Sequence, residues 1–252
     1  MFKQKFKATL IHFGLSLLFA GLSIGSIIFF FFPTLFINIT DFREVASIVI
    51  LVDLVLGPLL TFIVFKPNKK SLRFDLTVIA TIQICAFIYG AYTLYQIHPV
   101  YITFNVDRFT LVSAIDAHPE KAQYEEYRIS KLSSGKMAYS QFPDDPEKRN
   151  EILFNQLEGG GDIEQQVELY KPYKENIDQI ISKSLDPDLI FQNQNERNIA
   201  EDFLSKHQSN LNNLVFIPIN SPTKSAIIVL DKETAKAVTT IPIDPWTLSK
   251  VD

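Results

Sequence analysis

Three long apolar stretches dominate the first part of the chain, at residues 11–32, 45–65 and 76–95. At about 1.5 Å per helical residue each stretch is roughly 30 Å long, which matches the hydrocarbon thickness of a bilayer. The pattern therefore predicts three membrane-spanning helices. The first stretch follows basic residues, as a cleaved signal peptide would, but its apolar core is about twice the usual length, so we expect an uncleaved span.

The charges around these stretches predict their orientation. Lys3, Lys5 and Lys7 precede the first span, and the turn between the second and third spans holds the juxtamembrane basic cluster, which we define as Lys66, Lys69, Lys70 and Arg73. Cytoplasmic segments carry an excess of lysine and arginine. We therefore expect a membrane protein with a cytoplasmic N-terminus and an extracytoplasmic C-terminal domain. Topology and attraction to anionic lipid explain the basic cluster, and docking of a cytoplasmic partner is an alternative.

In the rest of the chain, residues 96–252, predicted strands are followed by predicted helices and then by further strands. This order predicts an α+β domain after the transmembrane domain of residues 1–95. Two strands at 100–106 and 109–114 flank Asp107-Arg108 as a hairpin. A helix-start signal follows at 116–120, and a short helix can begin at Asp162. The remaining expected elements are helices at 147–157, 176–185 and 195–207 and strands at 215–219, 225–230 and 235–241. Asp231-Lys232-Glu233-Thr234 lies between the last two strands as the loop of a second hairpin.

Asp53 is the first candidate functional residue, because it lies inside the second apolar stretch. A carboxylate in that position costs roughly 2.5 to 3.5 kcal/mol on insertion scales, so we expect it to face a polar partner instead of lipid. Residues of comparable depth are Ser23 and Ser26 in the first span and Phe87 and Tyr89 in the third. Asp53 therefore either accepts a hydrogen bond from Tyr89 or a serine, or recognises a polar group on another membrane helix.

Gly57-Pro58 follows Asp53 by one helical turn. Proline removes a backbone hydrogen bond and glycine allows close helix approach, so the pair predicts a packing kink or a notch that docks a partner helix. Asp75, at the start of the third span, is explained by capping of that helix.

The sequence gives little indication of nucleic-acid binding, metal binding or catalysis. Most of the acidic residues follow residue 95, so the C-terminal part is acidic and does not fit nucleic acid. The only cysteine, Cys85, lies in the third span, and we expect no metal, no cofactor and no enzymatic activity. The residues weighed and set aside are Gly159-Gly160-Gly161-Asp162 as a phosphate loop, Asp144, Asp145 and Glu147 as a calcium site, and His12, His98, His118 and His207 as metal ligands.

Read as a string, the membrane part carries more specific information: Val52-Asp53-Leu54-Val55-Leu56-Gly57-Pro58-Leu59-Leu60-Thr61, Val64-Phe65-Lys66-Pro67, Leu72-Arg73-Phe74-Asp75-Leu76, Ile82-Gln83 and Tyr89-Gly90. This string resembles the TfpX/TfpZ family of type IV pilin accessory proteins, which includes fimbrial assembly proteins of the FimB type. The resemblance extends less sharply to His98-Pro99-Val100 and Asp107-Arg108-Phe109. It implies an inner-membrane protein of Gram-negative bacteria that acts with a major pilin, and it implies no catalytic residues.

Together these observations predict a non-enzymatic pilin accessory factor that supports pilin stability, pilus assembly or pilus dynamics. Its expected partners are the major pilin, inner-membrane lipid and other pilus assembly components. The candidate partner-binding residues are Asp53, Gly57, Pro58 and Tyr89. The alternatives are a membrane-anchored sensor with a periplasmic ligand-binding domain and an anchored enzyme acting on the envelope.

Overall fold

The computed structural model describes residues 2–158, 161–191, 194–205 and 211–248. The chain forms two compact units. The first, the membrane unit, comprises the chain through Phe30 and Asp41–Ile97. The second, the soluble unit, comprises Phe31–Thr40 and His98–Asp252. The short connection between the first two spans therefore groups with the soluble unit, although the hydrophobic pattern alone assigns it to the membrane part.

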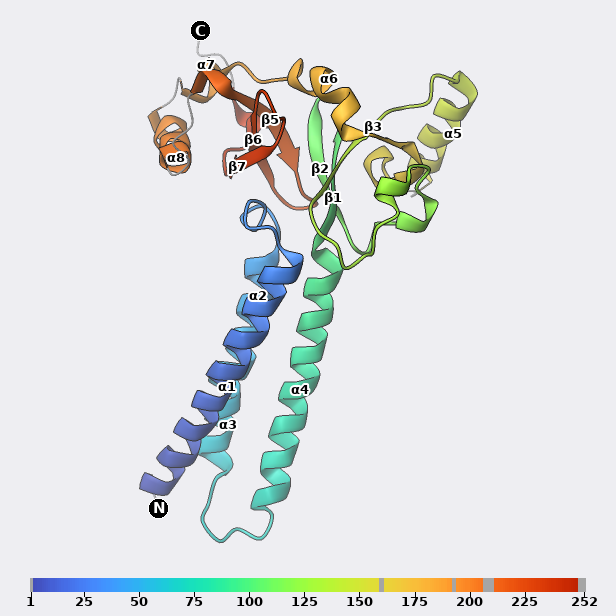
Figure 1. Cartoon of the computed structure of the whole chain (residues 1–252). Coiled ribbons are helices and arrows are strands. Elements are labelled where there is room, and N and C mark those ends of the chain that lie inside the picture. The colour runs from blue at the N-terminus through green and yellow to red at the C-terminus, as the bar shows by residue number, and fades with distance from the viewer. Residues whose placement is uncertain (1, 159–160, 192–193, 206–210, 249–252) are drawn as a thin grey trace. The chain divides into compact units, whose positions relative to one another are not determined.

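Three helices of the membrane unit are long and apolar enough to span a bilayer: Phe2–Phe31, Phe42–Val64 and Leu72–Ile97. They run side by side in Figure 1. The first is α1 (Phe2–Phe31) and the third is α4 (Leu72–Ile97). The second consists of α2 (Phe42–Leu51), the π-helical turn η1 (Val52–Leu56) and α3 (Gly57–Val64).

The π-helical turn has a local cause. Pro58 has no backbone N–H and its ring clashes with the carbonyl four residues earlier, so a regular α-helix cannot run through this point. The backbone N–H of Gly57 instead bonds to the carbonyl of Val52, five residues back. Such turns are uncommon and occur often at functional sites. The irregularity expected at Gly57-Pro58 is therefore present, and it takes the form of one wide turn that contains Asp53.

The soluble unit is built on a seven-stranded mixed sheet of order β4-β3-β1-β2-β5-β6-β7. The strands are β1 (Pro99–Asn105), β2 (Arg108–Ser113), β3 (Lys136–Ser140), β4 (Tyr170–Lys171), β5 (Leu214–Asn220), β6 (Ser225–Asp231) and β7 (Ala237–Ile241). The helices are α5 (Pro146–Leu157), α6 (Ile177–Ile181), α7 (Pro187–Phe191) and α8 (Gln194–Ser205). The predicted class, three N-terminal spans followed by an α+β domain, is confirmed.

The two predicted hairpins are also confirmed. β1 pairs antiparallel with β2, and β6 pairs antiparallel with both β5 and β7. The sequence pattern did not indicate β3, which lies parallel to β1, or the parallel pairing of β2 with β5. These parallel pairs join strands that are distant in the sequence, and a hairpin turn cannot create them.

Successive side chains of a strand point to opposite faces of the sheet, and in this sheet side chains on both faces are buried. In β6, Ala226, Ile228 and Leu230 belong to one core cluster, whereas Ile227 and Val229 belong to another. The first cluster also contains Phe36 and Ile39 from the segment 31–40. Thus two apolar residues that lie between the first and second spans complete the core of the soluble unit.

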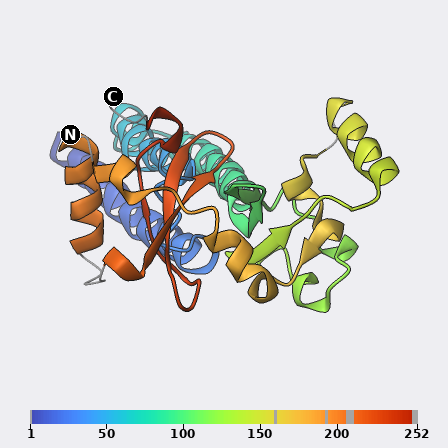
Figure 2. The ribbon, with the colours of Figure 1, turned by 90° about the horizontal axis from the view of Figure 1, so that it is seen from above.

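Two predicted helices are corrected. After Asp116 the chain forms only the 3-10 turns Pro119–Lys121 and Glu125–Tyr127, and the helix expected at 176–185 is reduced to α6. Tertiary hydrogen bonds override helix propensity in the first case, because the hydroxyl of Tyr127 donates to the carbonyl of Lys171 and the carbonyl of Tyr127 accepts from Tyr101. By contrast, α5, α8 and the short helical turn capped by Asp162 lie where the pattern placed them. Figure 2 shows α5 standing apart from the sheet.

Candidate functional site

The membrane unit buries one carboxylate near the centre of a span. Asp53 is the middle residue of Phe42–Val64 and is only 5% exposed. It lies in the wide turn η1, and it faces the other helices as the sequence predicted. Within the part of the chain that the structure describes, its Oδ2 atom has no hydrogen-bond partner.

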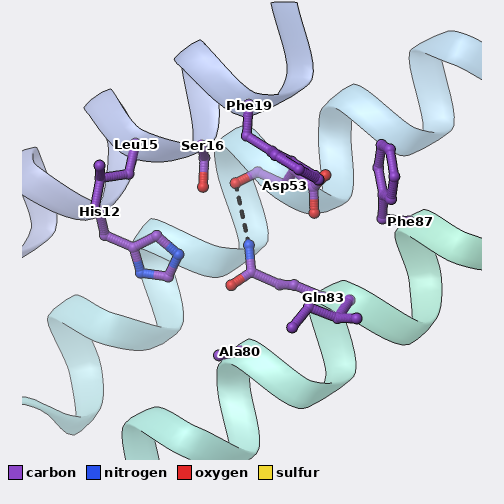
Figure 3. A pocket seen from close by; sticks show the side chains of 9 residues that line it. His12, Leu15, Ser16, Phe19, Asp53, Ala80, Gln83 and Phe87 are labelled. Carbon is purple, nitrogen blue, oxygen red and sulfur yellow. Dashed lines mark hydrogen bonds between the residues drawn. The ribbon is translucent and has the colours of Figure 1, made fainter. Parts of the chain in front are cut away.

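Asp53 lines a cavity of about 250 Å³ between α1, η1 and α4. Figure 3 shows the residues that surround it. Its polar lining residues besides Asp53 are His12, Ser16 and Gln83. The side-chain amide of Gln83 donates a long hydrogen bond of 3.4 Å to the backbone carbonyl of Asp53, and Nδ1 of His12 lies 2.6 Å from the hydroxyl of Thr61. The cavity therefore brings four polar side chains together within an otherwise apolar lining.

The residues of the first span that were expected at the depth of Asp53 were predicted wrongly. The α1 residues that line the cavity with it are His12, Leu15, Ser16 and Phe19, and Ser23 and Ser26 are not among them. The reason is the helix bounds: α2 begins at Phe42, so Asp53 lies deeper than a span beginning at residue 45 implies. On α4 the expected neighbour Phe87 does lie beside the cavity, where its ring packs 4.7 Å from that of Phe19.

Tyr89 meets Asp53 at a second hollow, of about 310 Å³, between α2 and α4. This hollow is mostly apolar, with Val45, Ile48, Val49, Val52, Ala86, Phe87 and Gly90 among its lining residues. Tyr89 is 74% exposed, so its ring reaches the outer surface of the membrane unit instead of bonding to the carboxylate. Asp53 thus lines both hollows, one bordered by α1 and α4 and the other by α2 and α4.

Gly57 and Pro58 are both buried within the membrane unit. A Cβ atom at Gly57 would overlap the side chain of Gln83 on α4. The close approach that a glycine permits is therefore used by the chain's own third span. These two residues shape the site, and the surfaces that remain open are those beside Asp53 and Tyr89.

The juxtamembrane basic cluster is exposed on the turn between α3 and α4. Lys69 forms an ion pair of 2.5 Å with Asp75, whose carboxylate also accepts from the hydroxyl of Ser71. Asp75 lies in the first turn of α4, where a carboxylate interacts favourably with the helix dipole. Lys66, Lys70 and Arg73 remain exposed around it.

The soluble unit carries two adjacent polar hollows of about 380 and 360 Å³, which share Asp116 and Gln165. The first also contains Arg108 and Glu164. Burial raises the pKa of the Asp116 and Glu164 carboxyls. No group of three or more metal-ligating side chains occurs among the described residues.

The remaining sequence candidates are dispersed. His98 is buried, with Nε2 3.3 Å from the carbonyl of Ser133, and His118 pairs with Glu120 at 3.1 Å. His207 and Gly159-Gly160 lie outside the described residues. The polar neighbours of Asp53 were not predicted. The available signal was that His12, Ser16 and Gln83 are polar residues within otherwise apolar spans.

Comparison with known proteins identifies the family. The chain is 30% identical to the fimbrial assembly protein of serogroup I from Dichelobacter nodosus, over 98% of this chain and 100% of that protein. It is 28% identical to the serogroup E1 protein of the same organism over the same shares. It is also 38% identical to the protein of serogroups C1 and C2 over 46% of this chain and 93% of that protein.

No family model matches the chain, and no solved structure matches it. The assignment therefore depends on the full-length relatives and on the membrane string that contains Asp53, Gly57 and Pro58. Because the 30% identity extends over nearly the whole length of both proteins, the chain belongs to the family of the fimbrial assembly proteins, the type IV pilin accessory proteins of the FimB type.

Proposed function

We propose that this protein is a non-enzymatic accessory factor of the type IV pilus that binds the major pilin in the inner membrane. It supports pilin stability, pilus assembly or pilus dynamics. Its family membership supports the biological process, since full-length relatives are named fimbrial assembly proteins. The observation that carries the binding role is the buried Asp53 carboxyl at the centre of a span, whose Oδ2 atom has no hydrogen-bond partner among the described residues. Ionisable residues within a span mark functional sites.

The orientation that this role requires follows from charge and connectivity. Residues 31–40 and the chain from His98 onward form one compact unit, so they lie on the same side of a membrane. The basic cluster lies at the opposite ends of the second and third spans. Positive charge favours the cytoplasm, which directs the soluble unit to the periplasm, where exported pilin subunits have their globular heads.

In this proposal the apolar helix of the pilin packs against the membrane unit beside Asp53. Asp53 and Tyr89 lie at open hollows, whereas Gly57 and Pro58 act indirectly by holding the π-helical turn and α4 in place. The acidic soluble unit contacts the head of the pilin. Other pilus assembly components and anionic lipid are further partners, the latter through the basic cluster.

In-cell crosslinking of the tagged full-length chain tests the proposal. We expect the major pilin to be isolated with the chain, and deletion of the gene to lower pilin abundance, surface pili or twitching motility. Reporter fusions at residue 252 and in the turn at residues 66–71 test the orientation. Unchanged pili after deletion, together with no pilin in the crosslinked complex, would refute the role.

The sensor alternative draws on the polar hollows of the soluble unit, in which Arg108 lies with Asp116 and Glu164. A small polar ligand that raises the unfolding temperature of the full-length chain would favour it. The same measurement on an Arg108→Ala variant would show whether that hollow is the binding site.

A further inference from the structure

We propose that the cavity between α1 and α4 binds a hydrogen-bond donor carried on the membrane helix of the pilin, with the Asp53 carboxylate as its acceptor. This inference rests on the proposed function and adds two things to it. It names the surface of the membrane unit that receives the partner, and it names the chemistry that the partner must provide.

The unmet acceptor is the first step. Asp53 is only 5% exposed, and its Oδ2 atom has no hydrogen-bond partner among the described residues. A buried polar group without a hydrogen bond costs free energy, and a charged one costs more. The site is therefore incomplete without a donor.

Among the residues that the structure describes, no group donates a hydrogen bond to that atom. Gln83 directs its amide to the backbone carbonyl of Asp53, at 3.4 Å, and His12 is engaged at Nδ1 with Thr61. Figure 3 shows the Asp53 side chain turned toward the Phe19 and Phe87 end of the cavity, away from His12. The lysines and arginine of the basic cluster lie at the end of the spans and do not line the cavity.

The cavity opens sideways, and this defines the source of the donor. Leu15, Phe19 and Ile84 line it and are 63%, 52% and 57% exposed, so its rim reaches the outer surface of the helices. At the centre of a span that surface faces hydrocarbon. A donor that arrives there comes on another transmembrane helix, and a volume of about 250 Å³ is suited to one side chain instead of a whole helix.

The second hollow, between α2 and α4, is less suited to this recognition. It shares Asp53, but its other lining residues are almost all apolar. The α1–α4 cavity has Ser16 and Gln83, whose side chains carry further acceptor oxygens, among its lining residues. The other polar residues of the α2–α4 hollow are Tyr89 and Thr93, and the Thr93 hydroxyl already donates to the carbonyl of Tyr89. The α1 side, with His12, Ser16 and Gln83, therefore gives an N–H or O–H group more polar neighbours.

Site-specific photo-crosslinking in the full-length chain tests this. A photoreactive residue at Leu15 on the rim should capture the major pilin, whereas one at Phe29, which is 82% exposed on the same helix but does not line the cavity, should capture it at least about tenfold less. Asp53→Leu should lower the Leu15 crosslink by about tenfold, which corresponds to the loss of one strong hydrogen bond. Asp75→Asn is the matched control, because it removes a carboxylate outside the cavity, and it should leave the crosslink unchanged.

Two further variants refine the result. Ser16→Leu fills the cavity without altering Asp53 and should also reduce the crosslink. Asp53→Asn keeps one carbonyl acceptor, so a retained crosslink indicates a hydroxyl or amide donor and a lost one indicates an ammonium donor. Membrane levels of each variant must equal the wild type.

An unchanged Leu15 crosslink in both Asp53→Leu and Ser16→Leu would overturn the inference. Pilin that is isolated with the wild-type chain but is never captured from Leu15 would overturn it as well, and would leave the proposed function intact. Capture of a second copy of this chain instead of pilin would also refute it. Absence of pilin from the wild-type complex would refute the proposed function itself.

Discussion

The side-chain amine of Lys224 donates a hydrogen bond of 3.0 Å to the backbone carbonyl of Thr40, across a sequence separation of 184 residues. The hydroxyl of Thr240 likewise donates to the carbonyl of Leu35. Between these two points Phe36 and Ile39 enter the core of the soluble unit. The connection between the first two spans is therefore a structural part of a domain whose other residues all follow the third span.

Phe36→Ala should destabilise the soluble unit. The side chain is 3% exposed, and truncation of a buried phenylalanine typically costs about 3–5 kcal/mol through lost burial and a cavity. Denaturant unfolding of the full-length chain in detergent, followed by the fluorescence of Trp246, measures the change, since this is the chain's one tryptophan. Phe154→Ala is the control: Phe154 is 64% exposed on α5, and its variant should remain within about 0.5 kcal/mol of wild type.

A fragment of residues 98–252 should be less stable than the same fragment joined to residues 31–40 by a flexible linker. The shorter fragment leaves the places of Phe36 and Ile39 in the core open and loses the bonds to Leu35 and Thr40. Resistance to limited proteolysis and the denaturation midpoint both report the difference. Equal stability of the two fragments would show that the segment adds nothing to the fold.

Gly90→Ala should weaken the packing of α2 against α4. A Cβ atom at this position would overlap Val49, and overpacking of a tight contact typically costs about 1–3 kcal/mol. Val49→Ala in the same chain should restore most of the loss, because it removes the overlapping methyl group. Gly21→Ala, where nothing lies within 4 Å, is the control and should not destabilise the helix. Unfolding in increasing dodecyl sulfate, followed by circular dichroism, measures all four proteins.

Stability should depend on pH through Glu164. Burial raises the pKa of this carboxyl above its ordinary value of 4.5, so the folded state binds the proton more tightly than the unfolded state does. Its contribution is fully present below the unfolded pKa and is lost as the pH rises through the folded pKa. Glu164→Gln should therefore gain stability relative to wild type as the pH rises above about 4.5.

Denaturation of Glu164→Gln and wild type between pH 4 and pH 8 measures that difference. Glu158→Gln, which neutralises an exposed carboxylate, should show a much smaller dependence. A constant difference between Glu164→Gln and wild type over the whole range would contradict the assignment.

Part of the candidate site was predictable from the sequence and part was not. Asp53 and the Gly57-Pro58 pair are visible because a charge and a proline are exceptional within an apolar span. The cavity residues His12, Ser16 and Gln83 come from three different positions along the chain, and which face of each helix turns inward depends on packing. The depth of Asp53 was misjudged because the apolar stretch is shorter than the helix that contains it.

The sequence by itself determined the three spans, the two hairpins and the helices α5 and α8. These features depend on interactions along the chain: the length of an apolar run, alternation over a few residues, and turn or capping residues between them. Only the tertiary structure decided that residues 31–40 complete the soluble core, that β1 and β2 acquire parallel neighbours, and that Asp53 borders an open cavity. Each of these depends on burial against residues far away in the chain, and local patterns carry no record of such partners.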